Sequence, residues 1–298
     1  MIHLIFTTLE PVMKKLIIMP IYFGISFLFL PITLLAGNEH LPVGARSAGM
    51  AHSSVTLNDH WSLFHNQAGL GRLKEISAGV YYENRFLVNS LSTGSLALAM
   101  PTKSGTFGLS VYTFGLSNYR ESKFGLAYGR MLGEKISAGL QLNYLSTLLP
   151  EAYGKYNGFT AELGLQALLT DKIILGAHIY NVSRAKLTDK NGLEYVPTVI
   201  RIGMMYKVST KVFITSEFQK DIDHPIIFRA GTEYQPNEKL FLRIGIATNP
   251  GNYSFGFGYK MKTISFDIAA SYHQILGFTP QVGFNWCGLS KKKTTVYW

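Results

Sequence analysis

The stretch ISFDIAASY, residues 264–272, decides the fold class of this chain. Apolar or aromatic residues at every second position alternate with small or polar residues such as Ser265 and Asp267. A period of two places the two sets of side chains on opposite faces of a β-strand. The same alternation returns at 240–246 and 254–260, so the chain is expected to be built from half-buried strands.

Runs of this kind fill the chain from Glu75 onward. Counting them predicts about fourteen strands, separated by turn residues and without a competing helical period. The expected strands are 76–83, 91–100, 106–116, 122–131, 135–147, 157–169, 172–181, 196–207, 211–220, 226–235, 239–247, 253–261, 263–273 and 279–287.

Charged residues lie within the strands on the polar face rather than at strand ends, as expected if that face lines a wet or plugged lumen. The predicted lumen-facing charges are Glu83, Glu162, Arg201, Glu217, Arg229, Glu233, Arg243 and Asp267. Alternation alone is shared by soluble sandwiches and membrane barrels. The runs, however, approach the roughly nine to eleven residues that a tilted strand needs to cross a bilayer. Tight joins also alternate with longer connections, as in bacterial outer-membrane barrels.

These features predict an all-β protein: a transmembrane, antiparallel, up-and-down β-barrel of about 14 strands. The barrel is expected to span residues 75–287, to lie in the bacterial outer membrane and to contact outer-membrane lipids. Glycine also recurs on the lumen face, where it permits close approach of another piece of backbone. Pro197, expected inside the strand 196–207, donates no ladder hydrogen bond and marks a place where the wall could open.

The first 36 residues are expected to be an export signal. Met13, an alternative start, and two lysines precede a long apolar run that closes on Ala36. A positive end, an apolar centre and small residues before the cleavage site are typical of a signal peptide. The alternative is a membrane-anchoring helix, because the run is long enough to span a bilayer. Pro20 and Pro31 favour the cleaved signal.

Residues 37–74 form a segment that is too polar for a lipid-facing strand and too apolar for a linker. We expect this segment to be a plug or hatch in the barrel mouth, anchored by Trp61, Leu63 and Phe64. The chain is expected to end in a basic tail, 288–298, that carries Lys291, Lys292 and Lys293.

The plug segment carries GARSAGM at 44–50, the run Val55 to Asp59, Trp61, and Asn-Gln-Ala-Gly-Leu at 66–70. This pattern resembles the N-terminal region of FadL-type outer-membrane barrels, including the PorV and PorQ proteins of type IX secretion. The departure is Gln67, where that family usually has proline. The plug-motif residues are Gly44, Arg46, Gly49, Met50, Asp59, Trp61, Phe64, Asn66, Gly69 and Leu70.

The resemblance implies a barrel of fourteen strands with an N-terminal plug. It further implies passage of long-chain fatty acids or other small hydrophobic solutes. The alternative that it implies is a PorV/PorQ-like protein of type IX secretion that binds partner proteins of the secretion system. A third reading, a soluble periplasmic β protein, stays open at this point.

Other activities lack a sequence signal. His52, Asp59, His60 and His65 match no zinc spacing, so no metal site is predicted. The chain has no GxSxG nucleophile elbow. We therefore expect no catalytic residues, no enzyme activity and no cofactor. The formal charge of +10 comes from scattered Lys and Arg residues, so no nucleic-acid partner is expected. Cys287 is the lone cysteine and cannot form an internal disulfide.

Overall fold

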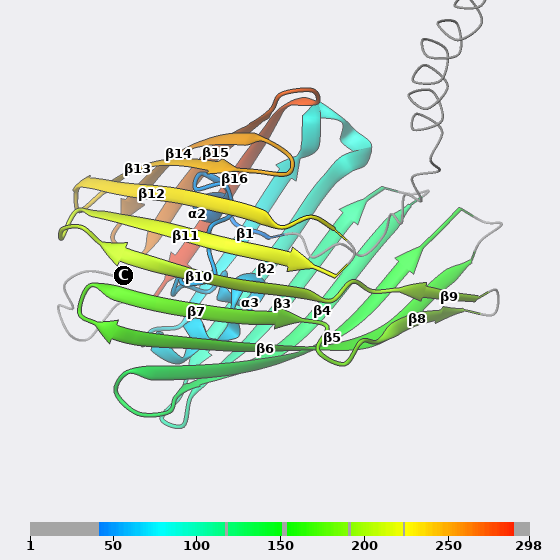
Figure 1. Cartoon of the computed structure of the whole chain (residues 1–298), viewed down its shortest axis with the longest axis horizontal. Helices are drawn as coiled ribbons and strands as arrows, with labels where there is room; N and C mark the ends of the chain where they lie inside the picture. The colour runs from blue at the N-terminus through cyan, green and yellow to red at the C-terminus, as the bar shows by residue number, and fades with distance from the viewer. Residues whose placement is uncertain (1–41, 117–118, 151–153, 190–191, 223, 289–298) are drawn as a thin grey trace, which may run out of the picture. The chain divides into compact units, whose positions relative to one another are not determined.

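The computed structural model describes residues 42–288, except 117–118, 151–153, 190–191 and 223. The predicted signal, residues 37–41 of the predicted plug and most of the basic tail lie outside the described residues. Almost all of the described chain is β-strand, and the strands close into one antiparallel barrel (Figure 1).

The strands follow the alternation in the sequence within a few residues. Their bounds are β1 Ser77–Asn84, β2 Ser92–Pro101, β3 Thr106–Gly115, β4 Arg120–Met131, β5 Ile136–Leu148, β6 Lys155–Thr170, β7 Ile173–Tyr180, β8 Lys186–Asp189, β9 Gly192–Tyr195, β10 Val199–Lys207, β11 Val212–Asp221, β12 Ile227–Asn237, β13 Leu240–Ala247, β14 Asn252–Met261, β15 Ile264–His273 and β16 Gly277–Cys287. The helices are α2 Ala45–Ala48, α3 Ser62–His65 and the 3₁₀ turns η1 Gln67–Arg72, η2 Arg85–Leu87 and η3 Asn89–Leu91.

Each strand of the wall pairs with its neighbours in antiparallel register. The first strand, β1, pairs with the last, β16, and the β5–β6 pairing completes the ring. Of the sixteen strands, β8 and β9 form a hairpin that joins β6 through one residue pair, so fourteen strands form the wall. This confirms the predicted barrel, while the hairpin was not predicted, because its strands have only four residues each.

The largest error in a predicted strand boundary is at the start of β10. The expected strand 196–207 begins at Val199, and Pro197 lies in the connection between β9 and β10. Proline is compatible with a connection because no ladder hydrogen bond is needed there. Pro197 therefore marks no opening within a wall strand.

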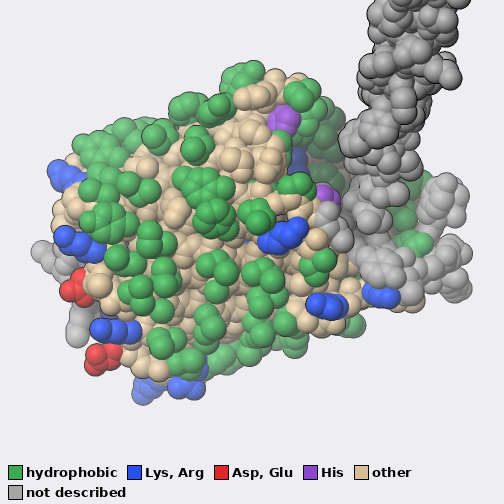
Figure 2. Space-filling model, in the orientation of Figure 1, with side chains coloured by type: hydrophobic (Ala, Val, Ile, Leu, Met, Phe, Trp, Pro, Cys, Tyr) green, Lys and Arg blue, Asp and Glu red, His purple; other side chains and the backbone are tan. Residues whose placement is uncertain are grey.

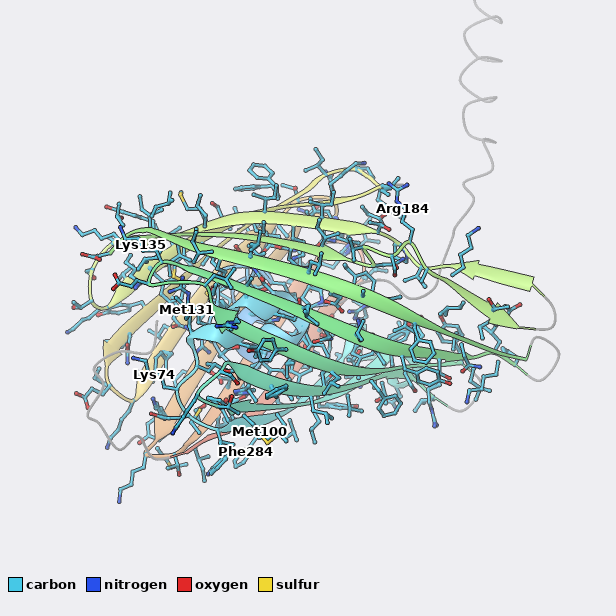
Figure 3. The ribbon with its side chains drawn as sticks, turned by 90° about the horizontal axis from the view of Figure 1, so that it is seen from below. Lys74, Met100, Met131, Lys135, Arg184 and Phe284 are labelled. Atoms are coloured by element: carbon cyan, nitrogen blue, oxygen red, sulfur yellow. The ribbon has the colours of Figure 1, made fainter. Side chains whose placement is uncertain are left out.

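The outer face of the barrel is apolar. Figure 2 shows hydrophobic side chains spread over the strands, with charged side chains gathered toward the ends. Leu126, Ile202 and Ile244 are among the exposed apolar residues, and Met100 and Phe284 point away from the barrel (Figure 3). A closed hydrogen-bond ladder with such an exterior suits the hydrocarbon core of a bilayer.

The two ends of the barrel differ in their connections. Lys74, Met131 and Lys135 lie at the end with the tight turns, and Arg184 lies near the opposite end (Figure 3). Short turns at one end and longer loops at the other are typical of bacterial outer-membrane barrels, whose short turns are periplasmic. This confirms the predicted outer-membrane location, and we refer to the two ends as the turn end and the loop end. None of the helices in the described ranges has the length and apolarity that a membrane-spanning helix requires.

Residues 42–74, hereafter the inner segment, run through the lumen, with α2 and α3 enclosed by the wall (Figure 1). Glycines of the wall make room for this second layer of backbone. A Cβ atom at Gly139 would overlap the backbone of Gln67, and one at Gly245 would overlap that of Met50. The lumen-facing glycines therefore allow backbone contact between the wall and the inner segment.

We expect Gly139→Ala to destabilise the folded barrel by about 1–3 kcal/mol, because the added methyl group forces the inner segment away from β5. Gly251→Ala is the matched control, since its Cβ would meet no atom closer than 3.7 Å. Urea unfolding in lipid vesicles measures both free energies. Equal stability of the two variants would contradict the close contact between wall and segment.

Candidate functional site

The inner segment starts with a turn that only glycine adopts easily. Gly44 precedes α2 with φ 107°, in the left-handed region, and the Trp61 ring packs where its side chain would be. At the other end of the segment, the Asn66 side chain accepts a hydrogen bond from the Ala68 N–H at 3.2 Å and caps η1. The same side chain donates to the carbonyl of Leu165 in β6 at 3.1 Å.

Arg46 in α2 joins the inner segment to the wall. Its Nε and Nη2 donate to the two carboxylate oxygens of Glu233, each at 2.9 Å, and its Nη1 donates to Asp59 at 3.2 Å. Glu233 also accepts from Arg243 Nε at 2.6 Å, and Arg243 Nη1 donates to Asp267 at 2.6 Å. Bidentate pairs of this kind fix geometry as well as charge. A chain of alternating charges thus links α2 to β12, β13 and β15.

The network continues through Asn285 to Trp61. Asn285 Nδ2 donates to Asp267 at 2.8 Å, and its Oδ1 accepts from Trp61 Nε1 at 2.8 Å. His60 Nε2 lies 3.0 Å from the same oxygen. The Trp61 ring is buried and packs edge-on against Tyr81, with ring centroids 6.0 Å apart. We refer to one connected set of side chains as the Arg46 network: Arg46, Asp59, His60, Trp61, Glu233, Arg243, Asp267 and Asn285.

A second group of contacts centres on Glu217 in β11. One carboxylate oxygen accepts from Arg201 Nε at 2.7 Å, and the other accepts the backbone N–H groups of Ser54 and Val55 at 2.8 and 2.9 Å. Arg201 donates in turn to Ser54 Oγ at 2.9 Å and to the His65 carbonyl at 3.2 Å. Both charged side chains are fully buried. A buried pair is tolerated only when its remaining hydrogen-bonding capacity is met, and here the inner segment meets it.

A third group surrounds Glu162 in β6. Gln67 Nε2 donates to its carboxylate at 2.7 Å, Asn143 Nδ2 donates at 2.8 Å, and His178 Nε2 lies at 2.9 Å. Lys123 Nζ lies 3.6 Å away. Proline at position 67 would have no amide to donate to Glu162. The departure from the family pattern at Gln67 therefore coincides with a direct bond between the inner segment and the wall.

The remaining predicted lumen charges also lie inside the barrel. Arg229 donates to Gln219 at 2.7 Å and lies 3.9 Å from Glu217. Toward the loop end, Glu83 accepts from the Tyr81 hydroxyl and forms an ion pair with Arg85. These contacts do not involve the inner segment.

The apolar plug-motif residues lie in the interior as well. Phe64, Leu70 and Met50 are fully buried. The Lys123 ammonium lies 5.4 Å from the centre of the Phe64 ring, a cation–π contact. Glycines of the motif fit tight places, since Gly49 meets the backbone of Gly256. A third motif glycine, Gly69, meets Ser62 within the segment.

The histidines of the inner segment serve packing and hydrogen bonding. His65 Nε2 donates to the Val43 carbonyl at 2.6 Å, and burial together with the Arg201 charge lowers the pKa of His65 to about 4. Burial likewise lowers the pKa of His52 and His60. Within the described ranges, no group of three or more His, Cys, Asp or Glu side chains is arranged to hold a metal ion.

A cavity of about 290 Å³ lies between the inner segment and strands β1 and β13 to β16. Its wall includes Arg46 and Trp61 from the segment and Phe241, Lys260 and Cys287 from the strands. Phe241, Lys260 and Cys287 lie at the turn-end limits of their strands, so the cavity lies on the periplasmic side of the Arg46 network.

Comparison with solved structures identifies the fold. The toluene transporter TbuX of Ralstonia pickettii matches with a TM-score of 0.61 and 15% identity, over 86% of this chain and 98% of that chain. The toluene transporter TodX of Pseudomonas putida matches with a TM-score of 0.62 and 13% identity, over 85% of this chain and 100% of that chain. The fold is that of the FadL-type barrels. A Pseudomonas aeruginosa FadL homologue also matches, with a TM-score of 0.57, 13% identity and coverage of 85% and 98%. No family model and no curated protein matches the chain.

Sequence reasoning missed the neutral polar residues that join the charged groups together. Asn285 connects Asp267 to Trp61, and Asn143 supports Glu162. Their only sequence signal was a place on the lumen face of a predicted strand. Which charges they meet depends on neighbouring strands and on the inner segment.

Proposed function

We propose that this protein passes small hydrophobic solutes through the outer membrane and that the inner segment is a movable plug. The observation that carries the proposal is the lumen itself, where a separate stretch of chain is held by buried hydrogen bonds and ion pairs. A purely structural barrel interior could be filled by wall side chains alone, as in small barrels. An interior filled by a separate segment supports a passage that opens when the segment shifts.

The proposed route starts at the loop end. There the solute meets aromatic side chains that face the lumen, among them Tyr81 and Tyr112, and then Phe64 of the inner segment. Apolar surface of this kind suits an uncharged or weakly polar solute. Displacement of α2 and α3 then opens the way to the turn end. No catalytic group takes part.

The solute class is supported by the fold. Two of the structural neighbours are described as toluene transporters, and a third as a FadL homologue. We propose hydrophobic compounds of this general kind, with long-chain fatty acids as the narrower candidate that the plug-motif resemblance implies.

Uptake by whole cells tests the proposal. Cells that express the protein should take up radiolabelled toluene or oleate several-fold faster than cells without it. Lowering the free-energy barrier to passage by about 1.4 kcal/mol raises the rate tenfold. Glu233→Gln, which weakens the hold on Arg46, should change this rate. Glu238→Gln, on an exposed turn next to the same strand, should not. If expression leaves the uptake of both solutes unchanged, the proposed passage is wrong.

The partner-binding alternative, a PorV/PorQ-like role, would need an exposed apolar patch on the long loops, predicted around Leu148, Leu149 and Tyr153. Leu148 is 38% exposed and Leu149 is half-buried, while Tyr153 lies outside the described residues. No observation favours this alternative over passage of a solute.

A further inference from the structure

The cavity below the Arg46 network has the make-up of a ligand site. Its volume of about 290 Å³ is near the lower limit of small-molecule pockets, which are typically about 300–1,000 Å³. Trp61, Leu73 and Phe241 give it an apolar side. Such a cavity suits a compact molecule with an aromatic or short aliphatic body.

Some of the cationic side chains that line the cavity form ion pairs with acidic side chains, and others do not. Arg46 and Arg243 are already bound to acidic partners within the Arg46 network. Arg72 and Lys74 also line the cavity, and neither forms an ion pair with an acidic side chain in the described part of the chain. Arg72 donates instead to the Lys135 carbonyl at 2.9 Å.

Lys260 is a further cation that lines the cavity, and Glu75 is the acidic lining residue that lies outside the Arg46 network. Side-chain polar groups of two further lining residues, the Asn58 amide and the Ser77 hydroxyl, have no hydrogen-bond partner among the described residues. Buried donors normally have partners, so an occupant that brings acceptor oxygens would complete this wall.

The Arg46 network presents its weakest contact to the cavity. The Arg46–Asp59 pair, at 3.2 Å, is longer than the Arg46–Glu233 bonds, and both side chains are nearly a fifth exposed. A negatively charged group in the cavity can therefore approach the outer side of the Arg46 guanidinium without breaking its bidentate bond to Glu233.

We propose that this cavity is a binding site for a compact organic carboxylate on the periplasmic side of the inner segment. The carboxylate lies among Arg72, Lys74 and Lys260, and the apolar body lies against Trp61 and Phe241. The inference goes beyond the proposed passage, because a cavity of about 290 Å³ is a resting site for a compact ligand at the turn end and not a route for a long-chain solute. Binding to the purified barrel is measured without transport, so either proposal can fail alone.

Titration of the detergent-solubilised full-length protein with 4-fluorobenzoate, followed by ¹⁹F line broadening, tests the site. Lys74→Glu combined with Lys260→Glu should weaken binding about tenfold or more, since each change replaces an attraction by a repulsion. Lys172→Glu with Lys211→Glu makes the same change in net charge on turns that do not line the cavity, and should leave binding intact. Equal binding by both double variants would overturn the proposal.

Two further measurements keep the test independent of folding. Labelling Cys287 of the folded protein with a sulfonate-bearing thiol reagent puts a bulky anion into the cavity, and should abolish 4-fluorobenzoate binding. Unchanged affinity after complete labelling would contradict the site. Equal binding of 4-fluorobenzyl alcohol would show an apolar pocket without anion selectivity, and equal binding of inorganic phosphate would show a charge site without an apolar part. Either result overturns an organic carboxylate as the ligand.

Discussion

Deletion of residues 42–70 is expected to raise ion conductance at least about tenfold, because large barrels without a filled lumen leave an aqueous channel. The wall itself should survive the deletion. Its ladder is closed without the inner segment, since β1 pairs with β16 and β5 with β6. Charges such as Glu162 and Glu217 would then be hydrated by lumen water rather than left without partners.

Single-channel recordings in planar bilayers measure this effect. The control is deletion of 188–193, which shortens the β8–β9 hairpin at the loop end and leaves the inner segment in place. Both variants are first checked for heat-dependent mobility on gels, which reports a folded barrel. A folded 42–70 deletion that conducts no better than the control would refute the plug.

Glu217→Ala is expected to destabilise the protein by about 3–5 kcal/mol, the usual cost of removing one partner from a buried ion pair. The substitution leaves the Arg201 charge buried, and it removes the acceptor for the N–H groups of Ser54 and Val55. Urea unfolding in vesicles gives the free energy. Glu238→Ala, on an exposed turn, removes the same carboxylate and should cost less than about 0.5 kcal/mol.

The double variant Arg201→Ala with Glu217→Ala separates the ion pair from the packing around it. If the unpaired charge is the main cost, the double variant is less destabilised than the sum of the two single variants. Strict additivity would mean that the two side chains act independently, against the 2.7 Å contact between them.

The sequence predicted most of the wall, because a strand's alternation is a local property. Residues 264–272 lie wholly within β15, and the runs at 106–116 and 135–147 match β3 and β5 to within one residue at each end. The closed ring of fourteen strands followed from the number of runs and from the alternation of tight and long connections. The β8–β9 hairpin was not predicted, because a strand of four residues is too short to show a clear alternation.

The partners of the charged residues were beyond the sequence. Placing Glu233 and Arg46 inside the barrel required only the face of a strand and a plug motif. The two residues lie 187 positions apart in the chain. They meet because the closed wall surrounds α2. The sequence by itself determined which side chains face inward, since that depends on local periodicity. Only the tertiary structure decided which of them meet, since burial in a shared lumen selects partners by distance and charge rather than by order along the chain.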